Sequence, residues 1–475
     1  MLREVSRSAR DLAEAVKINV EAAKSDVENK IAPLASELDI KATEAALRFK
    51  GAAAELLGKG DRWAVLSAAP PKVEQHQLHV GQPVLTEHDD ANHPDGLACA
   101  SAVISGSSLI AYGGLKRDGL SSGLWHCDLS SGAWRLVTTR GSEPKPRAAH
   151  SAVLHVSGMY IYAGYGTPDH NGDTLLGDVH RLDLYEGRWQ PVDTLGQPPC
   201  SRCSHVAALV GDAMYIFGGE ATSEGYAPPK RSKEAPAVQA CIENESDTSS
   251  AVVDVSGFRI VNDMHVLPLK SHGGEWRRVQ PSGSVPCERS GACSTVLGGR
   301  VYLFGGCNDA RCELDDLWEF RTKTATWCRL PTVSESAMNP QCESPGPRAL
   351  SGAALVAIPQ RNSLLLFGGS TKTNYYGDLF SYQLPSRKDR RAHSSSGEGK
   401  RTQHRSLGRG VAYVDNHHKH ISGWSRIEMA GVPPPRRANH AMLSHNGRLI
   451  IFGGFDGSSF LGDVHAAVLS STSNM

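Results

Sequence analysis

The chain has 475 residues with 50 Lys plus Arg and 50 Asp plus Glu, so its formal net charge is zero. This balance gives no general reason to bind nucleic acid or an anionic membrane surface, and no apolar run is long enough to predict a membrane-spanning helix. The N-terminal residues lack an apolar signal core and the 11 cysteines are an odd number, so we expect a cytoplasmic protein with reduced thiols.

Residues 1–58 are predicted to form an amphipathic helical arm. They are rich in Ala, Glu, Lys and Leu, and apolar positions recur from Val20 to Leu56 with the spacing of a nearly straight helix that Pro33 kinks. We expect the arm to pack on the rest of the chain, to self-associate as a coiled coil, or to grip a partner helix. The sequence does not separate these three, and binding to a lipid surface is a further alternative.

A repeated strand motif begins near residue 109. Short runs rich in β-branched and aromatic residues end in two small residues, which indicates buried strands followed by tight turns. A glycine there permits positive φ and close approach of a neighbouring backbone. The pairs are Gly113–Gly114, Ala163–Gly164, Gly218–Gly219, Gly305–Gly306, Gly368–Gly369 and Gly453–Gly454.

Three further residue types recur at similar distances from these pairs along the chain. Arginines precede most of the runs, at Arg147, Arg202, Arg289, Arg348 and Arg437. Acidic turns follow, at Asp178, Asp263, Asp316, Asp378 and Asp463, and tryptophans come last, at Trp134, Trp189, Trp276, Trp327 and Trp424. We expect the arginines to be structural, since a buried guanidinium needs paired acceptors, and the tryptophans to pack between neighbouring units.

This order of arginine, glycine pair, acidic turn and tryptophan resembles the kelch repeat over roughly residues 61–470. The resemblance implies an all-β, six-bladed kelch β-propeller at residues 59–475 after the N-terminal α-helical extension. The sixth repeat ends before its tryptophan, so the strand that carries Trp63 is expected to close blade six. Blade one lacks both the arginine and the acidic turn, and blades three and five carry insertions at about 220–260 and 385–420.

The resemblance also implies a binding surface. In kelch domains that bind peptides, residues beside the repeated arginine and just after the glycine pair line one mouth of the channel. Carried over to this chain, the partner-binding residues are Leu115, Lys116, Tyr165, Ser204, Glu220, Ser290, Asn308, Thr371, Asn439, Phe455 and Asp456. This set mixes charges and includes two aromatic residues, which suits a polypeptide partner.

Groups that would suit metal binding or catalysis have simpler interpretations. Glu87 to Asp90 with His93, Asp169 to Asp173, and His417, His418 and His420 lie in polar segments or turns, and the second group lacks the glycine and glutamate of a Ca²⁺ loop. Cys200 and Cys203 have no second pair to complete a zinc site, and His150, His205 and His440 recur at one structural place. We therefore expect no catalytic residue, metal or cofactor; a metal-dependent enzyme that uses the channel mouth is the alternative.

The insertion at about 385–420 is basic, with eight Lys and Arg against two acidic residues from Arg387 to Arg409. We interpret it as a solvated loop; docking of an acidic tail, a nuclear address and tuning by phosphorylation are alternatives. Without interleaved aromatic residues it does not favour specific nucleic-acid binding. No BTB, F-box or phosphatase segment is evident, so the leading hypothesis is an adaptor whose mouth binds one protein while the arm tethers, dimerises or recruits another.

Overall fold

The computed structural model describes residues 62–67, 93–169, 174–222, 258–269, 274–332, 346–385 and 423–469. The chain divides into two compact units, Met1–Gly58 and Lys59–Met475, and every described residue belongs to the second. The predicted arm at 1–58 and most of the predicted insertions at 220–260 and 385–420 lie outside the described residues. Within the described ranges, no helix is long and apolar enough to cross a membrane.

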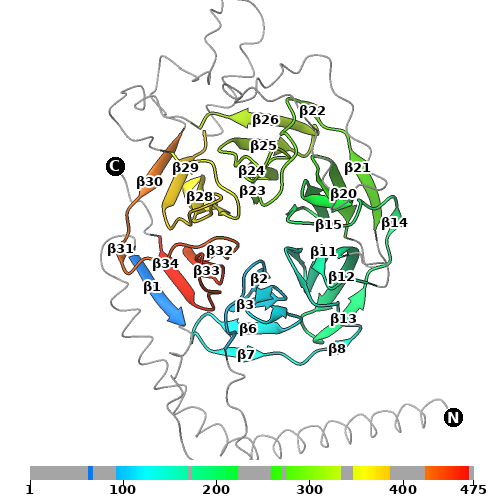
Figure 1. Cartoon of the computed structure of the whole chain (residues 1–475), viewed down its shortest axis with the longest axis horizontal. Coiled ribbons are helices and arrows are strands. Elements are labelled where there is room, and N and C mark those ends of the chain that lie inside the picture. Colours follow the sequence, from blue (N-terminus) through cyan, green and yellow to red (C-terminus); the bar gives the residue numbers. More distant parts are fainter. Residues whose placement is uncertain are drawn as a thin grey trace, which may run out of the picture. The chain divides into compact units, whose positions relative to one another are not determined.

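Six antiparallel sheets of four main strands surround a central axis as the blades of a propeller (Figure 1). In each blade the first strand lies nearest the axis and the fourth lies outermost (Figure 1). The all-β propeller expected from the sequence is therefore confirmed. Blades one to three are formed by β2 (Ser101–Ser105), β3 (Ser108–Tyr112), β6 (Leu124–Asp128) and β7 (Trp134–Leu136); by β10 (Ser151–His155), β11 (Gly158–Gly166), β12 (Leu175–Asp183) and β13 (Arg188–Pro191); and by β16 (Val206–Val210), β17 (Ala213–Phe217), β20 (Met264–Pro268) and β21 (Glu275–Val279).

The second strand of each blade consists almost entirely of apolar residues. In β28 (Ser363–Phe367), for example, every residue is buried, because both faces of a blade pack against neighbouring blades, as happens when a sheet is covered on both sides.

Blades four to six are formed by β23 (Cys293–Leu297), β24 (Arg300–Phe304), β25 (Leu317–Arg321) and β26 (Thr326–Leu330); by β27 (Ala354–Ile358), β28 (Ser363–Phe367), β29 (Leu379–Gln383) and β30 (Trp424–Ile427); and by β32 (Ala441–His445), β33 (Arg448–Phe452), β34 (Val464–Val468) and β1 (Arg62–Ser67).

Blade six combines the two ends of the described chain. Strand β1 runs antiparallel to β34, with Trp63 opposite Ala467 and Arg62 opposite Val468. In Figure 1, the blue strand β1 lies outside the red strand β34. The N-terminal strand of the propeller thus fills the outer place that the last repeat leaves empty, and it covers an edge that would otherwise be free to pair with another chain.

Six buried tryptophans pack between adjacent blades. Each lies on the outer strand of one blade and contacts an aromatic residue at the end of the second strand of the preceding blade. The ring centroids are 5.8 Å apart for Trp63 and Phe367, 4.9 Å for Trp134 and Phe452, 4.9 Å for Trp189 and Tyr112, 5.2 Å for Trp276 and Tyr162, 5.2 Å for Trp327 and Phe217, and 5.5 Å for Trp424 and Phe304. The contact of Trp63 with blade five makes this circuit complete.

Short strands complete the blades at their ends. Four of them pair in parallel with an outer strand, and these are β8 (Arg140–Gly141), β14 (Leu195–Gly196), β22 (Ser282–Gly283) and β31 (Ala430–Gly431). The others are β4 (Leu115–Lys116), β5 (Gly119–Leu120), β9 (Arg147–Ala148), β15 (Arg202–Cys203), β18 (Glu220–Thr222) and β19 (Phe258–Ile260), and a 3-10 turn, η3 (Pro359–Arg361), joins β27 to β28. The second group surrounds the glycine pairs, where the candidate site is formed.

Candidate functional site

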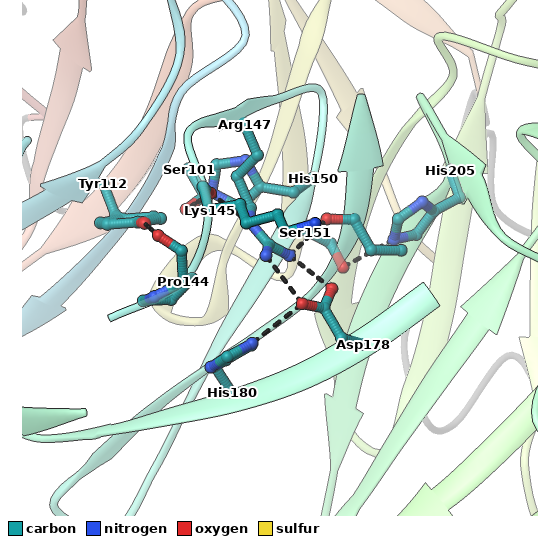
Figure 2. A network of polar contacts seen from close by, with 11 residues as sticks. Ser101, Tyr112, Pro144, Lys145, Arg147, His150, Ser151, Asp178, His180 and His205 are labelled. Carbon is teal, nitrogen blue, oxygen red and sulfur yellow. Dashed lines mark hydrogen bonds and ion pairs between the residues drawn. The ribbon is translucent and has the colours of Figure 1, made fainter. Parts of the chain in front are cut away.

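Four blades contain the same buried ion pair. In blade two, Arg147 Nη1 and Nη2 donate to the two carboxylate oxygens of Asp178 at 2.7 and 2.8 Å (Figure 2). Arg147 Nη1 also donates to the carbonyl oxygen of Ala163 at 3.0 Å. His180 Nε2 lies 2.9 Å from the same carboxylate. The equivalent pairs are Arg202–Asp263, Arg289–Asp316 and Arg437–Asp463, and these four arginines are at most 1% exposed.

Each pair ties the segment before the first strand to the start of the third strand. Burial acts against ionisation of Asp178, but hydrogen bonds from Arg147 and His180 hold the pKa of this carboxyl well below its usual range. Asp263 and Asp463 have pKa values lowered in the same way by their arginine and histidine partners. Because each of these guanidinium groups donates to the aspartate and to two backbone carbonyl oxygens of its own blade, the arginines are positioned to hold the frame rather than to contact a ligand.

Arg348 does not take this place, although the sequence grouped it with the other four. It is exposed, and its guanidinium lies 4.4 Å from the ring centroid of Tyr376. In the four blades with the ion pair, the arginine stands two residues before a residue with positive φ, and we call its place the anchoring position. In blade five the residue with positive φ is Gly352, with φ of 63°. The anchoring position therefore belongs to Leu350, which is 3% exposed, and Asp378 pairs instead with Arg426 at 2.6 Å.

The residues with positive φ form a closed ring around the axis, which we call the axial ring. In each blade the backbone N–H donates to the carbonyl oxygen of the equivalent residue in the preceding blade, and the six N–O distances are 2.7–2.9 Å. The members are Cys99, Ala149, Ser204, Gly291, Gly352 and Asn439, with φ between 52° and 64°. At Gly352 an added Cβ would lie 2.6 Å from Asn439 Oδ1, so the ring has little room there for a side chain.

The mouth lies at the end of the propeller where this ring is found. Neighbouring strands of a blade are antiparallel, so the start of the first strand, the end of the second and the start of the third meet at one end. Of the predicted partner-binding residues, Ser204 and Asn439 belong to the axial ring. Ser290 is one residue before it and pairs with Cys307, and Gly291 takes the ring position of that blade.

The residues directly after the glycine pairs form the rim of the mouth. Leu115, Tyr165, Glu220 and Phe455, all predicted from the sequence, take this position and pair with the segment beside the axial ring. In blades four and five the position belongs to Cys307 and Ser370, which sequence reasoning missed; counting from the second glycine would have found them. The predicted residues Lys116, Asn308, Thr371 and Asp456 come one residue further along the chain.

The rim side chains are apolar on one half of the propeller and more polar on the other. On the consecutive blades six, one and two it presents Phe455, Leu115 and Tyr165, which we call the apolar half; Leu115 and Tyr165 are 37% and 43% exposed. Phe455 packs against Tyr375 and Phe460, with ring centroids 5.6 and 5.1 Å apart. On blades three, four and five the rim presents Glu220, Cys307 and Ser370, the polar half, where Glu220 lies 3.7 Å from Arg311.

The repeat histidines lie below the axial ring and line a central cavity of about 260 Å³. His150 Nε2 is 2.7 Å from Ser101 Oγ, and His205 Nε2 is 2.8 Å from Ser151 Oγ; each bond joins a histidine to the inner strand of the preceding blade. Burial, together with the nearby charge of Arg147 or Arg437, lowers the pKa of His150 and of His440 to about 3. Neutral, buried imidazoles at a repeated place are consistent with a structural role.

The candidate metal-binding groups fall almost entirely outside the described residues. This holds for residues 87–90, 170–173 and 417–420; His93 is described, and its Nδ1 lies 2.8 Å from the carbonyl oxygen of Pro94. Among the described residues, no three His, Cys, Asp or Glu side chains are grouped to hold a metal ion. Cys203 is buried, and burial raises the pKa of its thiol to about 12, which disfavours a reactive thiolate.

Comparison with known proteins agrees with the repeated geometry. The chain is 28% identical over 304 residues to the Leucine-zipper-like transcriptional regulator 1 homolog of Drosophila melanogaster, a match that covers 60% of this chain and 26% of that protein. It is 25% identical over 274 residues to human Kelch domain-containing protein 3, covering 57% of this chain and 60% of that protein. The match thus spans less than two thirds of either relative.

Two further matches concern the family and the fold. A solved structure, that of YjhT, superposes with a TM-score of 0.51 at 14% identity and covers 78% of this chain and 95% of its own, which shows the fold alone. The model of the KLHDC2/KLHL20/DRC7 Kelch-repeats domain matches residues 83–228, 254–342 and 329–474. With its buried arginines, glycine pairs and interblade tryptophans in phase with these matches, the chain belongs to the KLHDC2/KLHL20/DRC7 Kelch-repeats family.

Proposed function

We propose that this chain is a protein-interaction scaffold that acts as an adaptor and binds a polypeptide at the mouth of its propeller. The observation that carries the proposal is the rim. Its side chains differ from blade to blade, whereas the interblade tryptophans and the axial ring repeat in all six blades and the buried arginine pair in four. A rigid frame that presents varied, partly exposed side chains suits recognition of a polypeptide, in which apolar and polar groups alternate.

The proposal extends to the rest of the chain. Residues 1–58 would tether the propeller, self-associate or recruit a second partner, and we propose that the adaptor works in the cytoplasm. The nine cysteines in the described ranges are free thiols, which is consistent with a reducing compartment. The relatives support the scaffold role through the shared repeats.

The test compares two tyrosines of blade two in the full chain. Tyr165 is on the rim and 43% exposed, whereas Tyr185 follows the third strand at the opposite end and is 94% exposed. Proteins captured from cell extract by wild type, Tyr165→Ala and Tyr185→Ala are identified by quantitative mass spectrometry. Partners that depend on the mouth should be depleted by Tyr165→Ala and by Phe455→Ala, and kept by Tyr185→Ala.

A second comparison separates the mouth from the arm. If every partner of the full chain is kept by both rim variants but lost from residues 59–475, binding belongs to the arm and the mouth proposal fails. Partners that remain with residues 59–475 and are lost from the rim variants assign recognition to the propeller.

A further inference from the structure

The end of the propeller opposite the mouth is formed by two turns from each blade. One turn joins the first strand to the second and the other joins the third strand to the fourth, because neighbouring strands are antiparallel. In blade four these turns are residues 297–300 and 321–326. In blade six the third and fourth strands are β34 and β1, from the two ends of the propeller. We call the surface formed by these turns the basal face.

The charged residues of these turns are separated by sign. In the described turns of blades one to three, Arg188 is the one basic residue, and the acidic residues are Asp128, Asp183, Glu186, Asp212 and Glu275. The described turns of blades four to six have no acidic residue, and their basic residues are Arg300, Arg321, Lys323, Arg361 and Arg448, with Arg62 at the start of β1. These two groups of three blades lie on opposite sides of the axis (Figure 1). The basal face therefore has an acidic half and a basic half.

The excess of positive charge in blade four is not needed by its turn. Asp128 and Asp183, at the ends of their third strands, accept hydrogen bonds from backbone N–H groups of the turns that follow. Arg321 has this place in blade four and cannot accept such a bond. Its Nε and Nη1 of Arg300 both donate to one carboxylate oxygen of Glu319, at 2.8 and 2.6 Å. Two guanidinium groups thus share one carboxylate, and a net positive charge remains.

The charges of the basal face are accessible to a partner. The side chain of Asp212 is 88% exposed and that of Arg321 is 48% exposed, and Glu186 and Lys323 are exposed as well. Val156, in the first turn of blade two, is 85% exposed, so the acidic half also offers apolar surface. The alkyl stems of facing arginine and lysine side chains are suited to cover such a residue.

The separation of the charges favours one kind of partner. An acidic ligand that covered the whole face would be repelled by one half, and a basic ligand would be repelled by the other. A second copy of the chain avoids both conflicts. When two basal faces meet about a two-fold axis parallel to the boundary between the halves, the acidic half of each copy lies opposite the basic half of the other. The formal net charge of zero adds no general repulsion between the copies.

We propose that two copies of this chain associate back to back through their basal faces. The interface is symmetric, with Lys323 and Arg448 of one copy in the half that faces Glu186 and Asp212 of the other. This inference goes beyond the proposed function, because the basal face and the mouth are at opposite ends of the propeller. The two mouths of the dimer face away from each other, so an adaptor of this form is bivalent and gains avidity for a partner with several recognition segments.

The experiment measures the association of the full chain by sedimentation velocity over a range of concentrations, at about 50 mM and about 500 mM salt. Two charge-reversal variants are compared with wild type: E186K/D212K removes negative charge from the acidic half, and K323E/R448E removes positive charge from the basic half. The variant K372E/R436E has the same change of charge as K323E/R448E, but its two exposed residues lie at the mouth end. It serves as the matched control.

Wild type should dimerise at low salt, and its dissociation constant should rise about tenfold or more at high salt because exposed charges are screened. Each basal-face variant alone should dimerise at least about tenfold more weakly than wild type, whereas the control keeps the wild-type constant. Mixing E186K/D212K with K323E/R448E should form a heterodimer, because the unaltered basic half of the first meets the unaltered acidic half of the second. A heterodimer also shows that both variants are folded.

Three results would overturn the proposal. A wild type that stays monomeric at low salt is the first. The second is a dimer that both basal-face variants keep, since self-association would then belong to another surface, such as residues 1–58. The third is a mixture of the two variants that forms no heterodimer although both are folded by circular dichroism. None of these results affects the mouth, which is tested separately by partner capture with Tyr165→Ala and Phe455→Ala.

Discussion

Three histidines occupy one position in the repeat, but only two of them have a serine partner. Ser101 and Ser151 are the first residues of their inner strands, and they bind His150 and His205 of the following blade. For His440 the equivalent residue of blade five is Ala354, and both ring nitrogens of His440 are buried without a hydrogen-bond partner among the described residues. A buried imidazole in this state is a cost to the folded protein.

Ala354→Ser should therefore stabilise the propeller. The new hydroxyl would stand where Ser101 and Ser151 stand in their blades, and one such bond contributes about 0.5–1.5 kcal/mol to the free energy of unfolding. Ser101→Ala, which takes the partner from His150, should have the opposite sign. Urea denaturation of the full chain measures both, and a destabilised Ala354→Ser would show that the site has no room for the hydroxyl.

The same histidines make stability depend on pH. Burial and, to a smaller extent, the charge of Arg437 lower the pKa of His440 from 6.5 to about 3, against the opposing effect of Asp463. Below about pH 6.5 the unfolded chain binds a proton that the folded chain refuses, so stability is present above this pH and is lost as the pH falls toward 3. His440→Ala should reduce the slope of unfolding free energy between pH 4 and 6 by up to about 1.4 kcal/mol per pH unit. An unchanged slope would mean that His440 is protonated in the folded state.

At the scale of the strand, β1 has the same task as five other outer strands but comes from the other end of the chain. Trp63 is 7% exposed and contacts Phe367 across the blade boundary, as Trp189 contacts Tyr112. The strand also forms the parallel pair with β31 that other blades form between their outer strands and the preceding linker. The blade that joins the two ends of the propeller is thus held by the same kinds of contact as the other blades.

Trp63→Ala should cost about as much stability as Trp189→Ala, roughly 3–5 kcal/mol for loss of a buried tryptophan. The free energy of unfolding of both variants is measured by denaturation, with Tyr185→Ala as a surface control. A Trp63→Ala variant as stable as the control would mean that β1 can leave blade six at little cost.

The strands and their aromatic contacts were predictable because their signals are local. Apolar runs, glycine pairs and tryptophans in phase mark second and fourth strands without knowledge of the neighbours. The register before the first strand was not predictable in blade five, because Pro347–Arg348 imitates the motif while the positive φ that defines the register lies at Gly352. Nor does the sequence show that, in blade one, Leu97 and Gly123 stand where other blades have the paired arginine and aspartate, since these two positions come together only when the blade has folded.

Across the whole molecule, the axial ring links every blade to two others. Because the circuit has no end, a blade cannot open without breaking two backbone hydrogen bonds of the ring and two interblade tryptophan contacts. Open solenoids differ, since their terminal repeats have one neighbour and fray first.

Hydrogen-exchange measurements should therefore give similar protection for the six backbone amides of the axial ring. The N–H groups of Cys99, Ala149, Ser204, Gly291, Gly352 and Asn439 should exchange with similar opening free energies, close to that of global unfolding. Exchange by mass spectrometry or NMR on the full chain measures this. Early exchange at Cys99 alone would show that blade one, without its ion pair, opens as a separate unit.

The direction of the bonds in the axial ring has an electrostatic consequence. All six N–H groups point to the preceding blade, so the peptide dipoles follow one another around a circle and their vector sum is close to zero. A helix directs its aligned dipoles at a ligand and so favours one sign of charge, whereas this backbone adds almost no field along the axis. Within the described part of the chain, the charge preference of the mouth therefore depends on side chains rather than on this ring of backbone dipoles, and a change such as Glu220→Lys can alter the ligand charge that is accepted while the frame stays the same.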